Sequence, residues 1–205
     1  MFARFALLAL AVLPLVPAQA QEPAPATAPQ PAVVRVVLET AEGPIVLALE
    51  KERAPVTTAN FLRYVDGKRL DGVAFYRATP IGQGYGLIQG GVRNDPKRVL
   101  PPIAHEPTSQ TGLSHVDGAI SMARAAPGSA NADFFITVGD LVSMDADPKQ
   151  PGDNQGFAVF GRVVEGMEVV RRILAAPTSP TAGEGAMKGQ MLAPPIPIVG
   201  ARRAD

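Results

Sequence analysis

The sequence predicts a mainly β fold, a closed antiparallel barrel formed by one domain. Short β-branched or aromatic runs recur along most of the chain, turn residues separate them, and only two segments show helical periodicity. Closing such a sheet removes the exposed edge strands that would otherwise pair with other chains. This pattern alone leaves a β-sandwich with two helices as the alternative fold.

The predicted strands begin at residue 33 and continue almost to the C-terminus. The first two, Val33–Thr40 and Ile45–Leu49, flank the turn Ala41-Glu42-Gly43 and therefore form a hairpin. Five β signals follow in the middle of the chain, and a last one closes the domain: Val73–Ala78, Tyr85–Gln89, Ala119–Ala123, Phe134–Val138, Phe157–Val163 and Ile196–Ala201.

Two segments place their apolar residues on one helical face. The first helix is expected over residues 55–67, with Thr57 capping its start and Gly67 ending it. Its apolar face is predicted to consist of Val56, Phe61, Leu62 and Val65. The second helix is expected at Met167–Ala175 after Gly166, with the apolar stripe Val169, Val170, Ile173 and Leu174.

The N-terminal residues have the features of a secretory signal peptide. Arg4 supplies a positive charge, residues 5–16 are apolar, and Ala18-Gln19-Ala20 is an A-x-A cleavage site. The apolar run is shorter than the about 20 residues that span a bilayer. We therefore expect a signal peptide at residues 1–20, a Pro- and Ala-rich spacer at 21–32, one domain at 33–205, and a periplasmic location.

Charge and cysteine content exclude several classes of function. The 19 Lys and Arg residues balance the 19 Asp and Glu residues, so no electrostatic argument favours nucleic acid or an anionic membrane as partner. The chain has no cysteine, which excludes disulfides, thiolate nucleophiles and Cys-ligated zinc.

One glycine-rich segment and one acidic segment superficially resemble a dinucleotide-binding loop and a calcium loop, but neither matches its motif. In the glycine-rich segment at 82–86, the third glycine of a dinucleotide-binding loop would fall on Leu87, and a strand rather than a helix follows. The acidic residues Asp145, Asp147 and Asp153 lack the spacing of a calcium loop, so they indicate a solvated loop. We therefore expect no bound metal and no cofactor.

The histidines also lack a catalytic or ligand pattern. His105 and His115 have no paired ligand spacing and are expected at the surface. Ser114 precedes His115, but the sequence shows no third member of a triad.

A different pattern is an ordered series of short motifs. Phe75-Tyr76-Arg77 is followed by Gln89-Gly90-Gly91, and three further motifs come later: Ser121-Met122-Ala123, Phe134-Phe135-Ile136, and Val159-Phe160-Gly161-Arg162-Val163 with Glu165-Gly166-Met167. With Asn60-Phe61 in the first helix, this series resembles the cyclophilin family over residues 33–200. The resemblance implies a closed eight-stranded antiparallel β-barrel capped by two α-helices, and peptidyl-prolyl cis-trans isomerase activity in a surface groove.

The same resemblance assigns the site. Arg77 matches the catalytic arginine of the family, and its guanidinium is a permanently charged, rigid fork of donors. Gln89 matches the family glutamine, which would bind the substrate carbonyl or brace Arg77. Phe135 is expected to form a wall of the proline pocket, whereas Phe134 is expected in the core. The other expected substrate contacts are Leu87, Ala123, Arg124, Met144 and Phe157.

The sequence departs from the family pattern at the edges of this site. The segment between Arg77 and Gln89 is longer than usual, and the usual aromatic three residues before Gln89 is Gly86, next to Tyr85. Phe157 replaces the usual histidine. Arg124 replaces an asparagine whose backbone pairs with an extended substrate. The chain has no Trp, so weak cyclosporin binding is expected.

The resemblance thus implies an enzyme that acts on X-Pro bonds of unfolded or flexible exported chains, as a monomer and without a cofactor. The alternative is a chaperone module that binds proline segments with little or no turnover. Arg77 and Gln89 together favour the enzyme.

Overall fold

A computed structural model describes residues 32–149 and 151–204 of the chain. The signal peptide predicted at residues 1–20, and all of the predicted spacer except Ala32, lie outside the described residues. The strands in the described part are β1 (Val33–Thr40), β2 (Gly43–Glu50), β3 (Val73–Gly82), β4 (Tyr85–Gly91), β5 (Ala119–Met122), β6 (Phe134–Val138), β7 (Ala158–Glu165), β8 (Thr178–Ser179) and β9 (Met191–Arg203).

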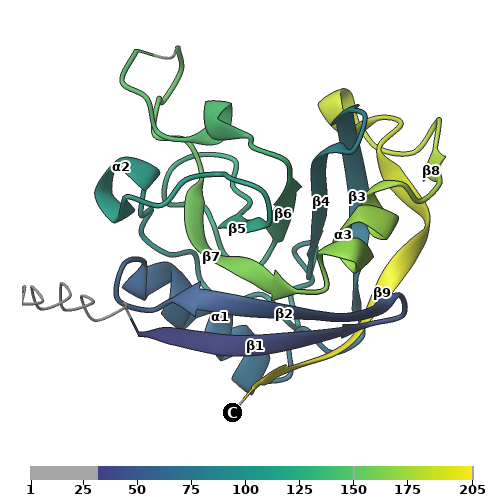
Figure 1. Cartoon of the computed structure of the whole chain (residues 1–205), viewed down its shortest axis with the longest axis horizontal. Coiled ribbons are helices and arrows are strands. Elements are labelled where there is room, and N and C mark those ends of the chain that lie inside the picture. The colour runs from purple at the N-terminus through teal and green to yellow at the C-terminus, as the bar shows by residue number, and fades with distance from the viewer. Residues whose placement is uncertain (1–31, 150, 205) are drawn as a thin grey trace, which may run out of the picture. The chain divides into compact units, whose positions relative to one another are not determined.

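Eight of these strands close into the predicted antiparallel barrel (Figure 1). The order around the sheet is β1-β2-β7-β5-β6-β4-β3-β9, and pairing of β9 with β1 completes the circle. The short β8 pairs only with β9, outside the ring. The closed barrel is therefore confirmed, and the sandwich alternative is excluded.

The described residues form three α-helices, of which the first and the third bury apolar faces against the barrel. They are α1 (Pro55–Asp66), the short α2 (Thr108–Thr111) and α3 (Met167–Leu174). The α1 helix lies against β2, β7 and β9, whereas α3 lies against β2, β3, β4 and β6. No helix in the described part is both long enough and apolar enough to cross a membrane.

The start of α1 corrects two predictions. Thr57 is not the N-cap: Ala54 holds that position, and Pro55 is the first helical residue. The free backbone N–H groups of Val56 and Thr57 donate to the carboxylate of Glu106, at 3.1 and 2.7 Å. Val56 does not belong to the apolar face of α1. The residue lies in the first turn of the helix and is 41% exposed to solvent.

The barrel interior is filled by alternate residues of the strands. Phe134, Phe75 and Phe160 are fully buried there, and Phe61 of α1 packs edge-on against Phe134 with ring centres 5.3 Å apart. Because successive side chains of a strand point to opposite faces, Phe135 must point out of the barrel. The prediction that Phe134 belongs to the core is confirmed.

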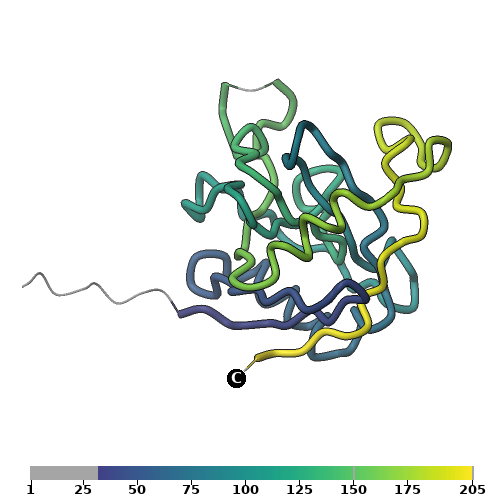
Figure 2. The backbone as a smooth tube through the Cα atoms, turned by 45° about the vertical axis from the view of Figure 1, so that its right-hand side comes forward, coloured from purple at the N-terminus to yellow at the C-terminus, as the bar shows by residue number. Residues whose placement is uncertain are grey.

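Three segments extend beyond the same end of the barrel. They are the β3–β4 hairpin, the β6–β7 connection around the 3-10 helix Val142–Met144, and the α3–β9 connection with the 3-10 helix Gly185–Met187. All three stand at the top of Figures 1 and 2. The extra residues between Arg77 and Gln89 extend the paired hairpin, since β3 continues past the predicted end at Ala78 to Gly82.

Candidate active site

The side chains of the predicted centre form one row across the barrel wall. Arg77 of β3 pairs with Gln89 of β4, Gln89 pairs with Phe135 of β6, and Phe135 pairs with Ser121 of β5. Residues in register across neighbouring strands share a face. The row thus places the predicted donor, the predicted amide and the predicted apolar wall side by side on the outer surface.

A β-bulge in β3 adds Tyr76 to this row. The register shifts between Phe75 and Arg77, so Tyr76 is the extra residue opposite β4. A bulge re-aims side chains and is often found beside active sites. Here it brings both Tyr76 and Arg77 within hydrogen-bond distance of Gln89.

Arg77 is held between two side-chain amides. Its Nη1 donates to Oε1 of Gln89 at 2.8 Å, and its Nε and Nη2 donate to Oε1 of Gln190 at 2.8 and 2.6 Å. Burial lowers the pKa of Arg77, but a guanidinium remains charged at neutral pH. The half-buried cation is therefore fixed in direction, and no carboxylate in the described part of the chain forms an ion pair with it.

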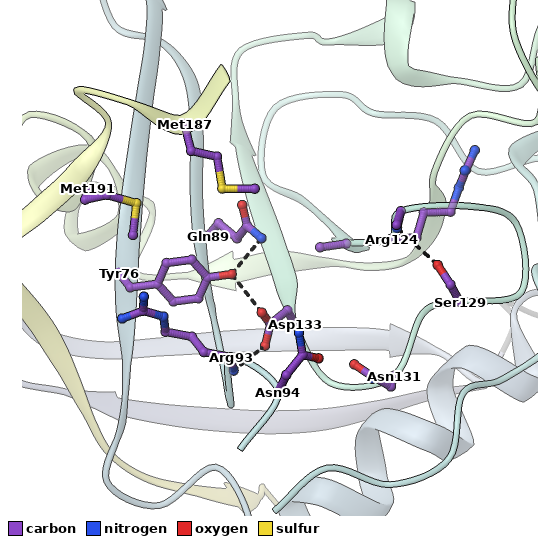
Figure 3. A pocket seen from close by; sticks show the side chains of 12 residues that line it. Tyr76, Gln89, Arg93, Asn94, Arg124, Ser129, Asn131, Asp133, Met187 and Met191 are labelled. Carbon is purple, nitrogen blue, oxygen red and sulfur yellow. Dashed lines mark hydrogen bonds between the residues drawn. The ribbon is translucent and has the colours of Figure 1, made fainter. Parts of the chain in front are cut away.

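The amide of Gln89 has a defined orientation. Its Oε1 accepts from Arg77, and its Nε2 donates to the hydroxyl of Tyr76 at 2.7 Å. That hydroxyl donates to Oδ2 of Asp133 at 2.8 Å, as Figure 3 shows. Burial, followed by the charge of Asp133, raises the pKa of Tyr76, which therefore stays protonated. Of the two roles considered for Gln89, this geometry supports the bracing of Arg77.

The apolar residues expected at the site form one cluster, which we call the outer cluster. Leu87, Phe135 and Leu141 are its buried members. The residues packed against them with part of their surface accessible are Tyr85, Ala123, Met144 and Phe157. The rings of Phe135 and Phe157 meet edge-on at 5.4 Å. The structure thus brings together five residues that are distant in sequence and that the sequence analysis expected at one site: Leu87, Ala123, Phe135, Met144 and Phe157.

The glycine that replaces the usual aromatic is required by the backbone. Gly86 has φ = 154°, and a Cβ at this position would lie 2.1 Å from the carbonyl oxygen of Thr79. No larger residue fits there without moving β3. The neighbouring Tyr85 packs against the outer cluster instead.

His115 is not at the surface, contrary to the sequence prediction. Its ring is fully buried and stacks on Phe135 with ring centres 5.7 Å apart. Nδ1 lies 2.5 Å from Oδ1 of Asp145, and Nε2 lies 3.0 Å from the hydroxyl of Ser121. Burial lowers the pKa of His115 despite the opposing effect of Asp145. This loop has no periodicity of apolar residues that would reveal the burial of His115.

Arg124 uses its side chain within the protein. The guanidinium donates to both carboxylate oxygens of Asp153 at 2.8 Å and lies 5.2 Å from the ring centre of Phe157. It also donates to the carbonyl of Gly156. Within residues 32–149 and 151–204, the backbone N–H and C=O of Arg124 form no backbone hydrogen bond. These backbone groups are thus available to an extended chain, and the expected substrate contact of Arg124 stays a prediction.

The acidic loop is only partly the solvated loop that the sequence predicted. Asp145 binds Ser114 and His115, and Asp153 binds Arg124, which lowers the pKa of Asp153 to about 2. Among the described residues, no group of three or more His, Cys, Asp or Glu side chains is arranged to hold a metal ion.

A groove runs beside the row (Figure 3). It has a volume of about 500 Å³, and its lining includes Tyr76, Gln89, Ala123, Arg124 and Met187. A second hollow of about 410 Å³ shares Tyr76, Met187 and Met191 with it and continues under the α3–β9 connection. An extended peptide crossing the groove would pass Gln89 and the free backbone of Arg124.

Comparison with known families agrees with this geometry. Residues 35–200 match the family described as cyclophilin type peptidyl-prolyl cis-trans isomerase/CLD. The chain is a member of the cyclophilin family. It is 39% identical to peptidyl-prolyl cis-trans isomerase A of Dickeya dadantii, over 67% of this chain and 70% of that protein. It is 37% identical to peptidyl-prolyl cis-trans isomerase cyp18 of Streptomyces antibioticus, over 80% and 93% of the two chains.

The fold of this cyclophilin is also found in solved structures. A cyclophilin-type peptidyl-prolyl cis-trans isomerase of Cryptosporidium parvum, crystallised in the presence of the dipeptide Ala-Pro, superposes with a TM-score of 0.67. The match covers 83% of this chain and 99% of that chain, at 20% sequence identity. The isomerase class and the barrel expected from the sequence are thus confirmed.

Three residues around Arg77 were missed by sequence reasoning. Tyr76 lies inside the Phe75-Tyr76-Arg77 motif, so its position could have suggested a role. Asp133 stands directly before Phe134-Phe135. Gln190 lies in a segment without periodicity, far from Arg77 in sequence, and no signal pointed to it.

Proposed function

We propose that this cyclophilin accelerates rotation about X-Pro bonds in exported polypeptides, with Arg77 as its catalytic residue. The observation that carries the proposal is the guanidinium held between Gln89 and Gln190, where Gln89 both lines the groove and pairs with Phe135 of the outer cluster.

The chemistry requires no cofactor. Rotation about an amide bond has a barrier of about 18–20 kcal/mol because the C–N bond has partial double-bond character. When the bond twists, the prolyl nitrogen regains its lone pair. A donor of Arg77 directed at that nitrogen stabilises the twisted form more than the planar one, which is the requirement for catalysis. Because the donor is already oriented, little reorganisation is needed during the reaction.

The outer cluster would hold the proline ring while the other side of the bond rotates. Met144 and Phe157 retain accessible surface next to the buried Phe135 and Leu87. The ring is apolar, so its burial against these side chains is favourable. The free backbone groups of Arg124 would pair with the extended peptide in the manner of an added strand.

The test is an isomerisation assay on residues 21–205 with a short X-Pro peptide. We expect Arg77→Ala to reduce kcat/KM by about 100-fold, in the range that an electrostatic donor contributes, with an unchanged fold by circular dichroism. Arg162→Ala, which removes an exposed arginine of β7, is the matched control and should behave as wild type. A folded wild-type protein that binds the peptide without accelerating its isomerisation would instead favour the chaperone module.

The proposed export rests on the N-terminal sequence alone. Arg4, the apolar run at residues 5–16 and Ala18-Gln19-Ala20 support a cleaved signal peptide and a periplasmic location. Expression of the full chain in a Gram-negative host, followed by fractionation and N-terminal sequencing, tests it. We expect a periplasmic protein that begins at Gln21. A full-length chain retained in the cytoplasm would contradict this part of the proposal.

A further inference from the structure

We infer that Gln190 is a positioning residue, which sets the direction in which Arg77 presents its charge to the substrate. The inference rests on the proposed role of Arg77. Oε1 of Gln190 accepts from Nε and Nη2 of Arg77 and from the hydroxyl of Thr79, the last at 2.9 Å. Arg77 and Thr79 both point outward from β3, so Gln190 lies across this face of the strand.

The donors of Arg77 show what this contact achieves. A guanidinium has five N–H groups in one plane. Among the described residues, Gln190 engages one on Nε and one on Nη2, while Gln89 engages one on Nη1. Two N–H groups, one on each terminal nitrogen, remain for a bound peptide. Because opposite edges of the plane are held, those two donors have a fixed direction.

The backbone around Gln190 makes it a firm anchor. Its carbonyl accepts from the N–H of Ala78, next to Arg77, at 3.0 Å, and its own N–H donates to Met187 at 3.1 Å. The following residue, Met191, pairs with Arg77 in the ladder between β3 and β9. The α3–β9 connection is thus attached to β3 at the position of the proposed catalytic residue.

The acceptor is also of a suitable kind. An amide oxygen orients a guanidinium through hydrogen bonds while leaving its positive charge uncompensated. A carboxylate at the same position would attract the charge to itself and compete with the prolyl nitrogen. Gln89 and Gln190 are both neutral amides, so the arrangement combines orientation with an available charge.

The experiment is a double-mutant cycle between Gln190 and Arg77 in the isomerisation assay, with kcat and KM measured separately. Gln190→Met keeps the side-chain length and removes the acceptor. We expect a fall of about tenfold in kcat, consistent with the loss of hydrogen bonds to a charged group, and a KM within about twofold of wild type. In the Arg77→Ala background the same substitution should have no further effect.

Lys188→Met is the matched control, because Lys188 is an exposed residue of the same connection; its rate should equal that of wild type. Gln190→Ala provides a second variant if Gln190→Met lowers the melting temperature. A wild-type kcat in a Gln190 variant, or an equal loss with and without Arg77, would overturn the inference while leaving the role of Arg77 intact. If Arg77→Ala itself retained the full rate, the proposed function would fail as well.

Discussion

The amide of Gln89 illustrates how single residues prepare the site. It accepts from Arg77 at one end and donates to Tyr76 at the other, and Asp133 in turn accepts from Tyr76. Each partner fixes the next, so the direction of Arg77 depends on a hydroxyl and a carboxylate that need not contact the substrate themselves.

Removal of the Tyr76 hydroxyl tests this chain of contacts. We expect Tyr76→Phe to lower kcat several-fold, because the Nε2 group of Gln89 loses its acceptor and the amide is free to turn away from Arg77. The isomerisation assay measures the effect. Tyr64→Phe is the control: it removes a buried hydroxyl that accepts from the N–H of Leu100 in another region. It should cost about 1 kcal/mol of stability and leave kcat unchanged. Equal rates for both variants would contradict the proposed chain.

The sequence predicted the residues of the site that lie within recognisable motifs. Arg77, Gln89 and Phe135 were found because they stand in motifs that resemble those of the cyclophilin family. Gln190 and the buried His115 were missed because their environments depend on how distant connections pack. A local pattern holds no information on such contacts.

The strands and their faces were more predictable than the connections between them. The resemblance to the family placed Phe134 in the core and Phe135 at the site, and the structure has Phe134 in the barrel core and Phe135 in the outer cluster. The extension of β3 through Pro80 was not predicted, since proline usually ends a strand. The N-cap of α1 was assigned wrongly to Thr57. The first N–H groups of the helix donate to the carboxylate of Glu106, which lies 49 residues from Thr57 in sequence, so no local pattern reveals this contact.

The outer cluster joins β4, β6 and the β6–β7 connection, and Phe135 is one of its buried members. We expect Phe135→Leu to weaken binding of an X-Pro peptide several-fold and to cost about 1–2 kcal/mol of stability. Phe61→Leu is the matched control in the barrel interior. It should lose comparable stability while peptide binding, measured by calorimetry, is unchanged. Unaltered binding by Phe135→Leu would show that the proline ring does not use this cluster.

For the whole molecule, the buried His115 makes stability depend on pH. Burial lowers the pKa of His115 in the folded state, whereas the unfolded chain titrates near about 6.5. Below that pH the unfolded state binds a proton that the folded state excludes, so protonation favours unfolding. The free energy of unfolding should therefore be largest above about pH 7 and should fall as the pH decreases through about 6.5.

Denaturant unfolding between about pH 7.5 and 5 measures this dependence. His115→Gln should remove most of the decrease, while His105→Gln should retain it because His115 is still present. An increase in wild-type stability on acidification would mean that His115 becomes protonated in the folded protein and that the pairing with Asp145 dominates.

Closure of the barrel also supports the site from both sides. Every strand of the ring has two neighbours, so the row of Arg77, Gln89 and Phe135 rests on a sheet without free edges. The strand pattern favoured this closure but left a β-sandwich as the alternative, and the resemblance to the cyclophilin family decided for the barrel. The connections that cover the site, including the one that supplies Gln190, were not predictable from them.

The central claim, that Arg77 acts on the rotating bond rather than on binding, is tested most directly by NMR exchange spectroscopy. An X-Pro peptide at equilibrium with the protein reports its affinity and its cis-trans exchange rate on the enzyme in one experiment. We predict that Arg77→Ala binds the peptide with an affinity within a few-fold of wild type but slows exchange by about 100-fold. Exchange at the wild-type rate in the bound Arg77→Ala variant would contradict the account.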